Sequence, residues 1–157
     1  MKKILVLMSL ISLALMITFT SCKKDDEEVV ADPLPEATIT GLAEVELDWT
    51  NTTPETAPSG TKVFASVWAG DLVETQIAGY DYQTFVYEGS INGDGVYTIK
   101  VPAKSSNAKA TITFADFEED VIVGAGVPTV RTIFTAGSNG TVINVVPGGN
   151  YILDAGY

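Results

Sequence analysis

The side chains of this sequence that could do chemistry are almost all carboxylates. The 157 residues include 20 Asp and Glu, 9 Lys and Arg, one Cys and no His. Without His, the chain cannot build a Ser-His-Asp or Cys-His nucleophile or a His-ligated zinc site. One Cys provides neither an internal disulfide nor a CxxC pair, and a formal net charge of −11 disfavours binding to nucleic acid phosphates. Acid–base chemistry on carboxylates, calcium binding and the absence of catalysis are the classes that remain.

The densest group of carboxylates lies between residues 116 and 120 and consists of Asp116, Glu118, Glu119 and Asp120. Calcium needs about six to eight oxygen ligands, but neither this segment nor the turn at residues 92–95 has the spacing of an EF-hand. We therefore expect a solvated acidic loop at 116–120, and no metal ion or cofactor. Hydrolysis of glycosides by two carboxylates is an alternative, although a small sandwich lacks the long loops that build a cleft.

Aromatic side chains suggest a second kind of site. In the strand expected around residues 62–68, Phe64 and Trp68 lie opposite the apolar face, and Tyr80 and Tyr82 follow in the next segment. Exposed aromatic rings on a sheet can hold sugar rings or a protein partner. We therefore take these four residues as a candidate ligand face. The alternative is that residues 70–78 fold over the rings and bury them as a second small core.

The single cysteine follows a sequence typical of an export signal. Lys2 and Lys3 form a basic start, an apolar run extends from Ile4 to Phe19, and small residues lead up to Cys22. This pattern indicates a secretory signal peptide, and the run is shorter than the ~20 residues of a membrane-spanning helix. An uncleaved N-terminal anchor and an ordinary signal peptide with an incidental cysteine are the alternatives.

Phe19-Thr20-Ser21-Cys22 resembles the lipobox of bacterial lipoproteins, although Phe19 stands where Leu is favoured. The resemblance implies that residues 1–21 are removed and that Cys22 receives lipid. The next six residues resemble the acidic export signal with which some Gram-negative bacteria send lipoproteins to the outer face of the outer membrane. They are Lys23, Lys24, Asp25, Asp26, Glu27 and Glu28. We expect an outer-membrane lipoprotein that faces the cell exterior on a tether of residues 22–36. The alternative interpretation of the charge run is a solvated spacer, for which such runs are also typical.

Residues 37–157 have the pattern of a single all-β domain. Short runs rich in Val, Ile, Thr, Tyr and Phe alternate between apolar and polar positions, and Gly, Pro and Asn separate them at 92–95, 138–140 and 147–150. The alternation predicts inward-facing side chains at Val45, Leu47, Trp49, Val63, Ala65, Val67, Tyr97, Ile99, Val101, Ile112 and Phe114. Antiparallel sheets with one buried face give this pattern. We expect an antiparallel β-sandwich of about seven or eight strands.

The order of several motifs in this domain resembles that of the carboxypeptidase-regulatory-like, or transthyretin-like (prealbumin-type), β-sandwich. The motifs are residues 37–41, residues 59–63, Asn92-Gly93-Asp94-Gly95-Val96-Tyr97-Thr98-Ile99-Lys100-Val101-Pro102, and residues 110–114. The resemblance covers residues 37 to 117 and implies a module that stabilises, adheres or docks and is not an enzyme. Because a fold does not settle function, two alternatives remain: a minor subunit of a surface fibre or adhesin, assembled by strand addition, and a carboxylate-based glycan hydrolase.

Overall fold

The structure, a computed structural model, describes residues 32–106 and 108–157. The expected signal peptide, Cys22 and the charged run 23–28 lie outside these residues. The described part is all-β, with a single turn of 3-10 helix, η1 (Ala69–Asp71), after the third strand. No helix in this part is long and apolar enough to cross a membrane.

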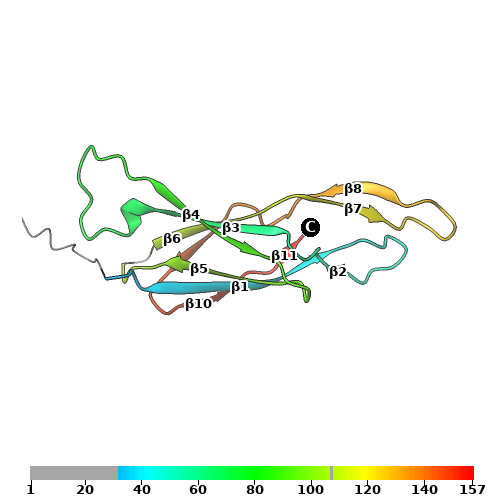
Figure 1. The fold of residues 1–157 in the computed structure, drawn as a ribbon, viewed down its shortest axis with the longest axis horizontal. Helices are drawn as coiled ribbons and strands as arrows, with labels where there is room; N and C mark the ends of the chain where they lie inside the picture. The colour runs from blue at the N-terminus through cyan, green and yellow to red at the C-terminus, as the bar shows by residue number, and fades with distance from the viewer. Residues whose placement is uncertain (1–31, 107) are drawn as a thin grey trace, which may run out of the picture. The chain divides into compact units, whose positions relative to one another are not determined.

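The strands form two sheets and a separate ribbon (Figure 1). The first sheet consists of β1 (Glu36–Val45), β2 (Glu55–Thr56), β5 (Val96–Pro102), β10 (Asn150–Ile152) and β11 (Ala155–Gly156). The second sheet has the order β4 (Thr84–Ser90), β3 (Lys62–Trp68), β6 (Ala108–Phe114) and β9 (Thr141–Val145). The ribbon consists of β7 (Phe117–Val121) and β8 (Val130–Phe134). The all-β sandwich expected from the sequence is therefore confirmed.

Strand number and direction refine this picture. Eight of the strands in the described part have five or more residues, in line with the expected seven or eight, and β2, β10 and β11 have only two or three. Pairing is antiparallel throughout the second sheet and between β1 and β5. In contrast, β10 and β11 run parallel to β1, because the chain crosses from β9 to the other sheet at residues 146–149 and arrives in the direction of β1.

The turn at residues 92–95 forms, but it does not join a hairpin. The side-chain oxygen of Asn92 accepts the backbone N–H of Val96 at 2.9 Å, and Gly95 has a φ of +77°, which favours glycine. The strands on either side then separate, since β4 pairs with β3 and β5 pairs with β1. Two backbone hydrogen bonds between Ile91 and residues 60 and 61 hold the end of β4 beside β3. This turn therefore carries the chain from one sheet to the other.

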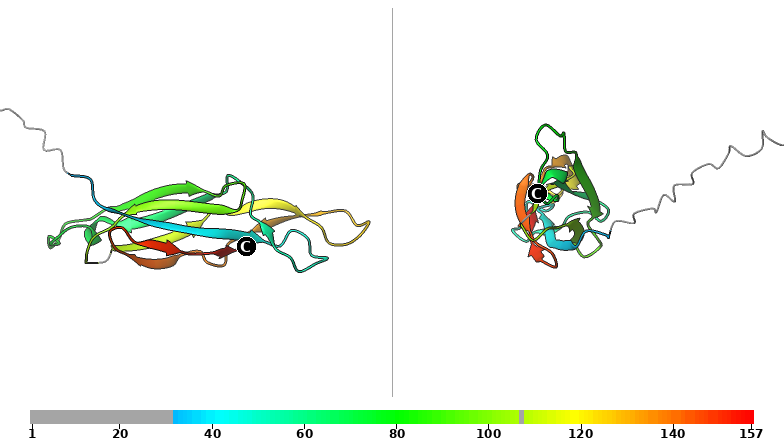
Figure 2. Two further views of the ribbon diagram at one scale, coloured as in Figure 1. Left: turned by 90° about the horizontal axis from the view of Figure 1, so that it is seen from below. Right: turned by 90° about the vertical axis from the view of Figure 1, so that its left-hand side faces the viewer.

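The core lies between the two sheets, which pack face to face (Figure 2). Nine of the eleven side chains predicted to point inward are buried, whereas Leu47 is only partly buried and Trp49 is 55% exposed, because β1 and its alternation end at Val45. On the inner face of β1, Ile39 and Ala43 are buried beside Val45. Among the buried residues of the described part, none is charged, and the hydroxyl of Tyr97 is the one polar side-chain group. Burial of a Val, Ile or Phe side chain contributes roughly 1.5–3 kcal/mol each. The interior is thus an apolar scaffold, and the groups that could meet a ligand are on its surface.

Tyr97 is the largest fully buried side chain, and it connects both sheets. Its ring meets Phe114 of the second sheet edge-on, with centroids 5.3 Å apart, and its hydroxyl donates a hydrogen bond to the backbone oxygen of Leu153. Burial raises the pKa of Tyr97 far above its ordinary value. Burial, helped by the nearby Asp116, also raises the pKa of Tyr157 to about 12. Both phenols therefore stay neutral and act as structural hydrogen-bonding groups.

The acidic loop expected at residues 116–120 is wrong, because this segment forms β7. Phe117 stacks on Phe134 with ring centroids 5.3 Å apart, and Val121 is fully buried. These two residues share the less exposed face of the strand with Glu119, whereas Glu118 and Asp120 lie on the exposed face. Arg131 of β8 lies 3.4 Å from Glu118 and 3.7 Å from Asp120. Within residues 32–106 and 108–157, no group of three or more carboxylates or cysteines has the arrangement of a metal site.

The register of β5 gives a first prediction. Ile99 is 3% exposed and faces the core, whereas Thr98 is exposed on the other face. We expect Ile99→Ala to lower the free energy of unfolding by ~2–5 kcal/mol, a large part of the roughly 5–15 kcal/mol of a typical domain. Thr98→Ala should change it by less than about 0.5 kcal/mol. Urea unfolding of both variants measures the difference, and equal effects would mean that the register is wrong.

Candidate functional site

Three of the four aromatic residues predicted as a ligand face lie together. They lie in or directly beside the β3–β4 connection, residues 69–83, which is at the end of the second sheet where the chain enters β1 (Figure 1). The Tyr82 ring meets Trp68 at 5.6 Å and Tyr80 at 4.7 Å between centroids, both edge-on. Phe64 lies on the same outer face of β3, half-buried, and makes no ring contact with the other three. We call Trp68, Tyr80 and Tyr82 the aromatic cluster.

Hydrogen bonds from the β3–β4 connection hold the aromatic cluster in place. The indole Nε1–H of Trp68 donates to the backbone oxygen of Tyr82 at 2.9 Å, and the Tyr82 hydroxyl accepts the N–H of Ile77 at 2.8 Å. The side-chain amide of Gln76 donates to the oxygen of Gly70 at 3.0 Å, so the connection folds back on itself. The rings are therefore positioned by backbone and side-chain contacts within the connection.

Gly70 leaves room for the indole. A Cβ atom at this position would lie 2.4 Å from two carbons of the Trp68 ring, closer than any real Cβ contact. Gly70 follows Trp68 by only two residues and is itself buried. The side chain of Trp68 can therefore lie over the first residues of η1 only because residue 70 has no side chain.

The connection lies beside the rings and does not cover them. Within the connection, Leu72 is buried. Trp68, in contrast, remains 39% exposed and Tyr80 62% exposed. Ile77, near the middle of the connection, is also exposed. The alternative of a second small core formed by residues 70–78 is thus realised only at Leu72, and the rings stay accessible to solvent.

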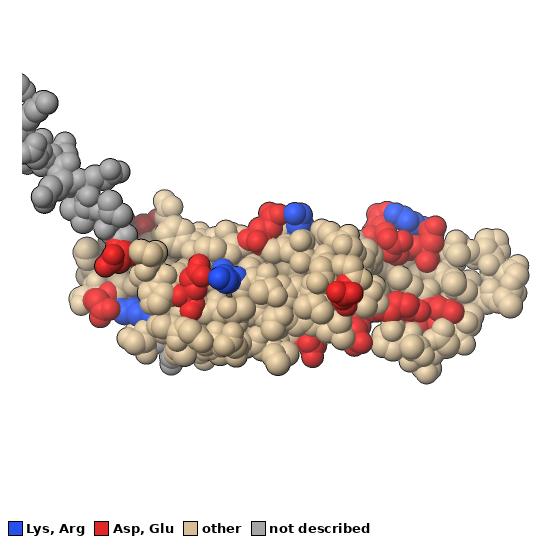
Figure 3. Space-filling view, turned by 60° about the horizontal axis from the view of Figure 1, so that its bottom comes forward, with Lys and Arg blue, Asp and Glu red and all other residues tan. Residues whose placement is uncertain are grey.

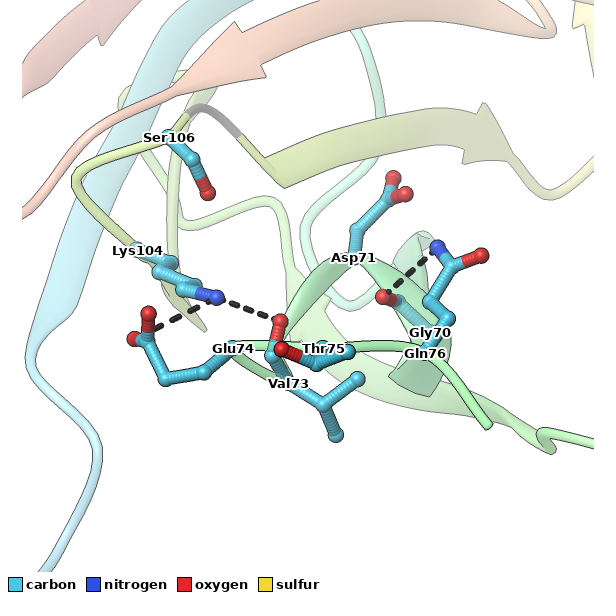
Figure 4. A pocket seen from close by; sticks show the side chains of 8 residues that line it. All are labelled: Gly70, Asp71, Val73, Glu74, Thr75, Gln76, Lys104 and Ser106. Carbon is cyan, nitrogen blue, oxygen red and sulfur yellow. Dashed lines mark hydrogen bonds and ion pairs between the residues drawn. The ribbon is translucent and has the colours of Figure 1, made fainter. Parts of the chain in front are cut away.

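Two hollows border the β3–β4 connection. A polar hollow of about 460 Å³ lies between the connection and the β5–β6 turn (Figure 4). There the ammonium group of Lys104 contacts the oxygen of Val73 and lies 3.3 Å from the carboxylate of Glu74. These groups fasten the connection to the sandwich. An apolar hollow of about 440 Å³ lies among Leu34, Leu72, Tyr80, Tyr82 and Phe85.

A third hollow, of about 390 Å³, lies on the outer face of the second sheet, and we call it the outer-face hollow. It is lined by Ser66, Trp68, Asp71, Thr84, Lys109, Thr111 and Val142. The carboxylate of Asp71 accepts the backbone N–H of Lys109 at 3.2 Å, which joins η1 to β6. One aromatic ring, two charges of opposite sign and three hydroxyl groups therefore converge from η1, β3, β4 and β6, and β9 contributes Val142.

The formal charges in this hollow balance, whereas the described part of the chain is acidic overall. The described residues include five basic and sixteen acidic side chains, and acidic patches with few basic groups beside them are visible in Figure 3. Lys62 lies 2.6 Å from Glu88 and Lys100 lies 3.5 Å from Glu36, so these amines serve ion pairs on the surface. The outer-face hollow holds Asp71 and Lys109, whose formal charges balance.

No protein-family model matches the chain, and a search of curated proteins finds no match. The function must therefore be inferred from the site. Sequence reasoning found Trp68, Tyr80 and Tyr82 from their residue type. It missed Asp71, Lys109 and Thr111. Lys109 and Thr111 lie near Trp68 because β3 pairs with β6. Asp71 joins them through its hydrogen bond to Lys109, which is 38 residues away in the sequence.

The contact between Gly70 and Trp68 gives a second prediction. Gly70→Ala should displace the indole and lower the free energy of unfolding by about 1–3 kcal/mol, as overpacking does. With Trp49→Phe in the background, Trp68 is the sole tryptophan of the chain, and its emission should move to longer wavelength. Gly93→Ala is the matched control, since a Cβ there meets nothing within 4 Å. An unchanged spectrum and stability in Gly70→Ala would contradict the packing described.

Proposed function

We propose that this protein is a lipoprotein of the outer membrane, displayed on the cell exterior, in which a non-catalytic β-sandwich binds a partner. The observation that carries the binding role is the aromatic cluster, where Trp68 and Tyr80 stay exposed although Tyr82 and the connection hold them in place. Exposing an aromatic ring to water is unfavourable in free energy, and aromatic residues are enriched at the surfaces through which proteins bind. A stable surface without a ligand would not need them.

The lipid anchor follows from the cysteine and its neighbours. Cys22 is the only thiol of the chain, and it ends the lipobox-like sequence that begins at Phe19. Each CH₂ group buried in a bilayer contributes ~0.8 kcal/mol, so two or three acyl chains hold a protein firmly. The acidic residues 25–28 support display on the outer face, and the sequence of residues 29–35, with two prolines, favours an extended spacer ahead of β1.

Two features support a non-catalytic role over glycan hydrolysis. The carboxylates of β7 face Arg131, so Glu118 and Asp120 serve ion pairs on a narrow ribbon. A hydrolase needs one carboxyl group on each side of a bound sugar in a cleft. The resemblance of residues 37–117 to transthyretin-like sandwiches points the same way, since those modules adhere or dock.

The anchor gives a third prediction, tested by detergent phase partitioning of cell lysates. We expect the natural chain to enter the detergent phase and Cys22→Ala to remain aqueous or unprocessed, because no thiol is left to receive lipid. Ser21→Ala is the matched control, since it keeps a small residue before the cysteine and should still be lipidated. Protease added to whole cells should remove the domain of the natural chain.

Two outcomes would overturn this proposal. Processed Cys22→Ala protein in the detergent phase would show that another element holds the chain at the membrane. Protection of the natural chain from protease on intact cells, with cleavage after lysis, would place the domain inside the cell envelope.

A further inference from the structure

We propose that the outer-face hollow is a binding site for an uncharged oligosaccharide, with Trp68 as the surface on which one sugar ring stacks. This inference rests on the binding role proposed above and names its ligand class. Sugar rings present a flat array of C–H groups on one side and hydroxyl groups around the edge. A site for them combines an aromatic ring with several hydrogen-bonding groups, and the outer-face hollow has both.

The stacking surface is fixed before a ligand arrives. Trp68 donates its indole N–H to Tyr82, meets the Tyr82 ring edge-on and lies over Gly70. The ring therefore has little conformational freedom to lose on binding, which reduces the entropic cost of association. With 39% of the residue exposed, the ring retains accessible surface for a ligand.

The polar groups of the hollow match the edge of a sugar. Asp71 accepts hydrogen bonds, Lys109 donates them, and the hydroxyls of Thr84 and Thr111 do both. These side chains come from η1, β4 and β6, so sheet pairing positions them around Trp68. The volume of about 390 Å³ lies in the range of roughly 300–1,000 Å³ that is usual for small-molecule sites.

Charge favours an uncharged glycan. Asp71 and Lys109 balance within the hollow, while the described residues carry sixteen acidic groups against five basic ones. A glycan rich in uronic or sialic acid would approach against this field. A protein partner would need a broader apolar surface than the Ser and Thr side chains that line the floor between Trp68 and Val142. The apolar hollow beside Tyr80 is the surface that suits an apolar side chain.

The test uses the full lipidated protein with Trp49→Phe, in a detergent without a sugar head group. Trp68 is then the only tryptophan and reports directly on the hollow. An array of neutral hexose, N-acetylhexosamine and deoxyhexose oligosaccharides identifies a binder, and fluorescence titration measures its affinity. Trigalacturonate is the acidic comparison. We expect a saturable change in Trp68 emission with at least one neutral oligosaccharide and none with trigalacturonate.

Variants locate the site. Trp68→Ala, read on the array, and Asp71→Asn, read by titration, should each weaken binding about tenfold or more, and Trp68→Phe should retain part of it. Phe85→Ala, in the apolar hollow and outside the aromatic cluster, is the matched control and should bind like the parent protein. Urea unfolding shows whether Trp68→Ala remains folded, and if it does not, Trp68→Phe and Asp71→Asn decide.

Three results would overturn the inference: no neutral oligosaccharide binds, trigalacturonate binds better, or Phe85→Ala weakens binding while Asp71→Asn leaves it unchanged. None of these results would contradict the lipid anchor or the surface display, because detergent partitioning and whole-cell proteolysis test those separately. Conversely, glycan binding by a chain that is not lipidated would leave the site intact and overturn only the location.

Discussion

The buried Tyr97 hydroxyl is the constraint on which the rest of the sandwich depends. Its hydrogen bond to the oxygen of Leu153 joins the middle of β5 to the segment between β10 and β11. That oxygen can come so close because Gly41, which pairs with Tyr97 across β1 and β5, has no side chain. A Cβ atom at Gly41 would lie 1.9 Å from it. One phenol and one glycine thus fix the place of Leu153 between the two short strands, and backbone pairing of β10 and β11 with β1 completes their parallel docking.

The position of the site follows from this interior. With Val63, Ala65 and Val67 held in the core, alternation sends Ser66 and Trp68 to the outer face of β3. Pairing with β4 and β6 then places Thr84 and Thr111 on the same face as Trp68 and Ser66. The scaffold needs no polar side chains inside, so the chain can present them at the surface. In the proposed site, stability and binding therefore depend on different residues of the same strands.

Local patterns in the sequence predicted what depends on neighbours along the chain. Alternation identified the buried faces of β3, β5 and β6, and the Asn-Gly and Gly-Gly steps identified turns. The strand β7 was missed because its carboxylates resemble a loop, whereas the stacking of Phe117 on Phe134, 17 residues later, determines its structure. The parallel direction of β10 and the meeting of Asp71 with Lys109 were likewise unpredictable. Both arise from contacts between segments that are distant in sequence, and residue type carries no sign of them.

We propose that a rigid apolar sandwich presents a preformed ligand site on the outer face of its second sheet. Hydrogen–deuterium exchange of the full lipidated protein, measured with and without a neutral oligosaccharide selected on the array, is the decisive experiment. We expect the slowest exchange in β1, β3, β5 and β6, faster exchange in residues 72–83, and ligand protection confined to residues 66–71, 83–85 and 109–111. Protection confined to the β7–β8 ribbon, or uniformly fast exchange across the four strands, would contradict it.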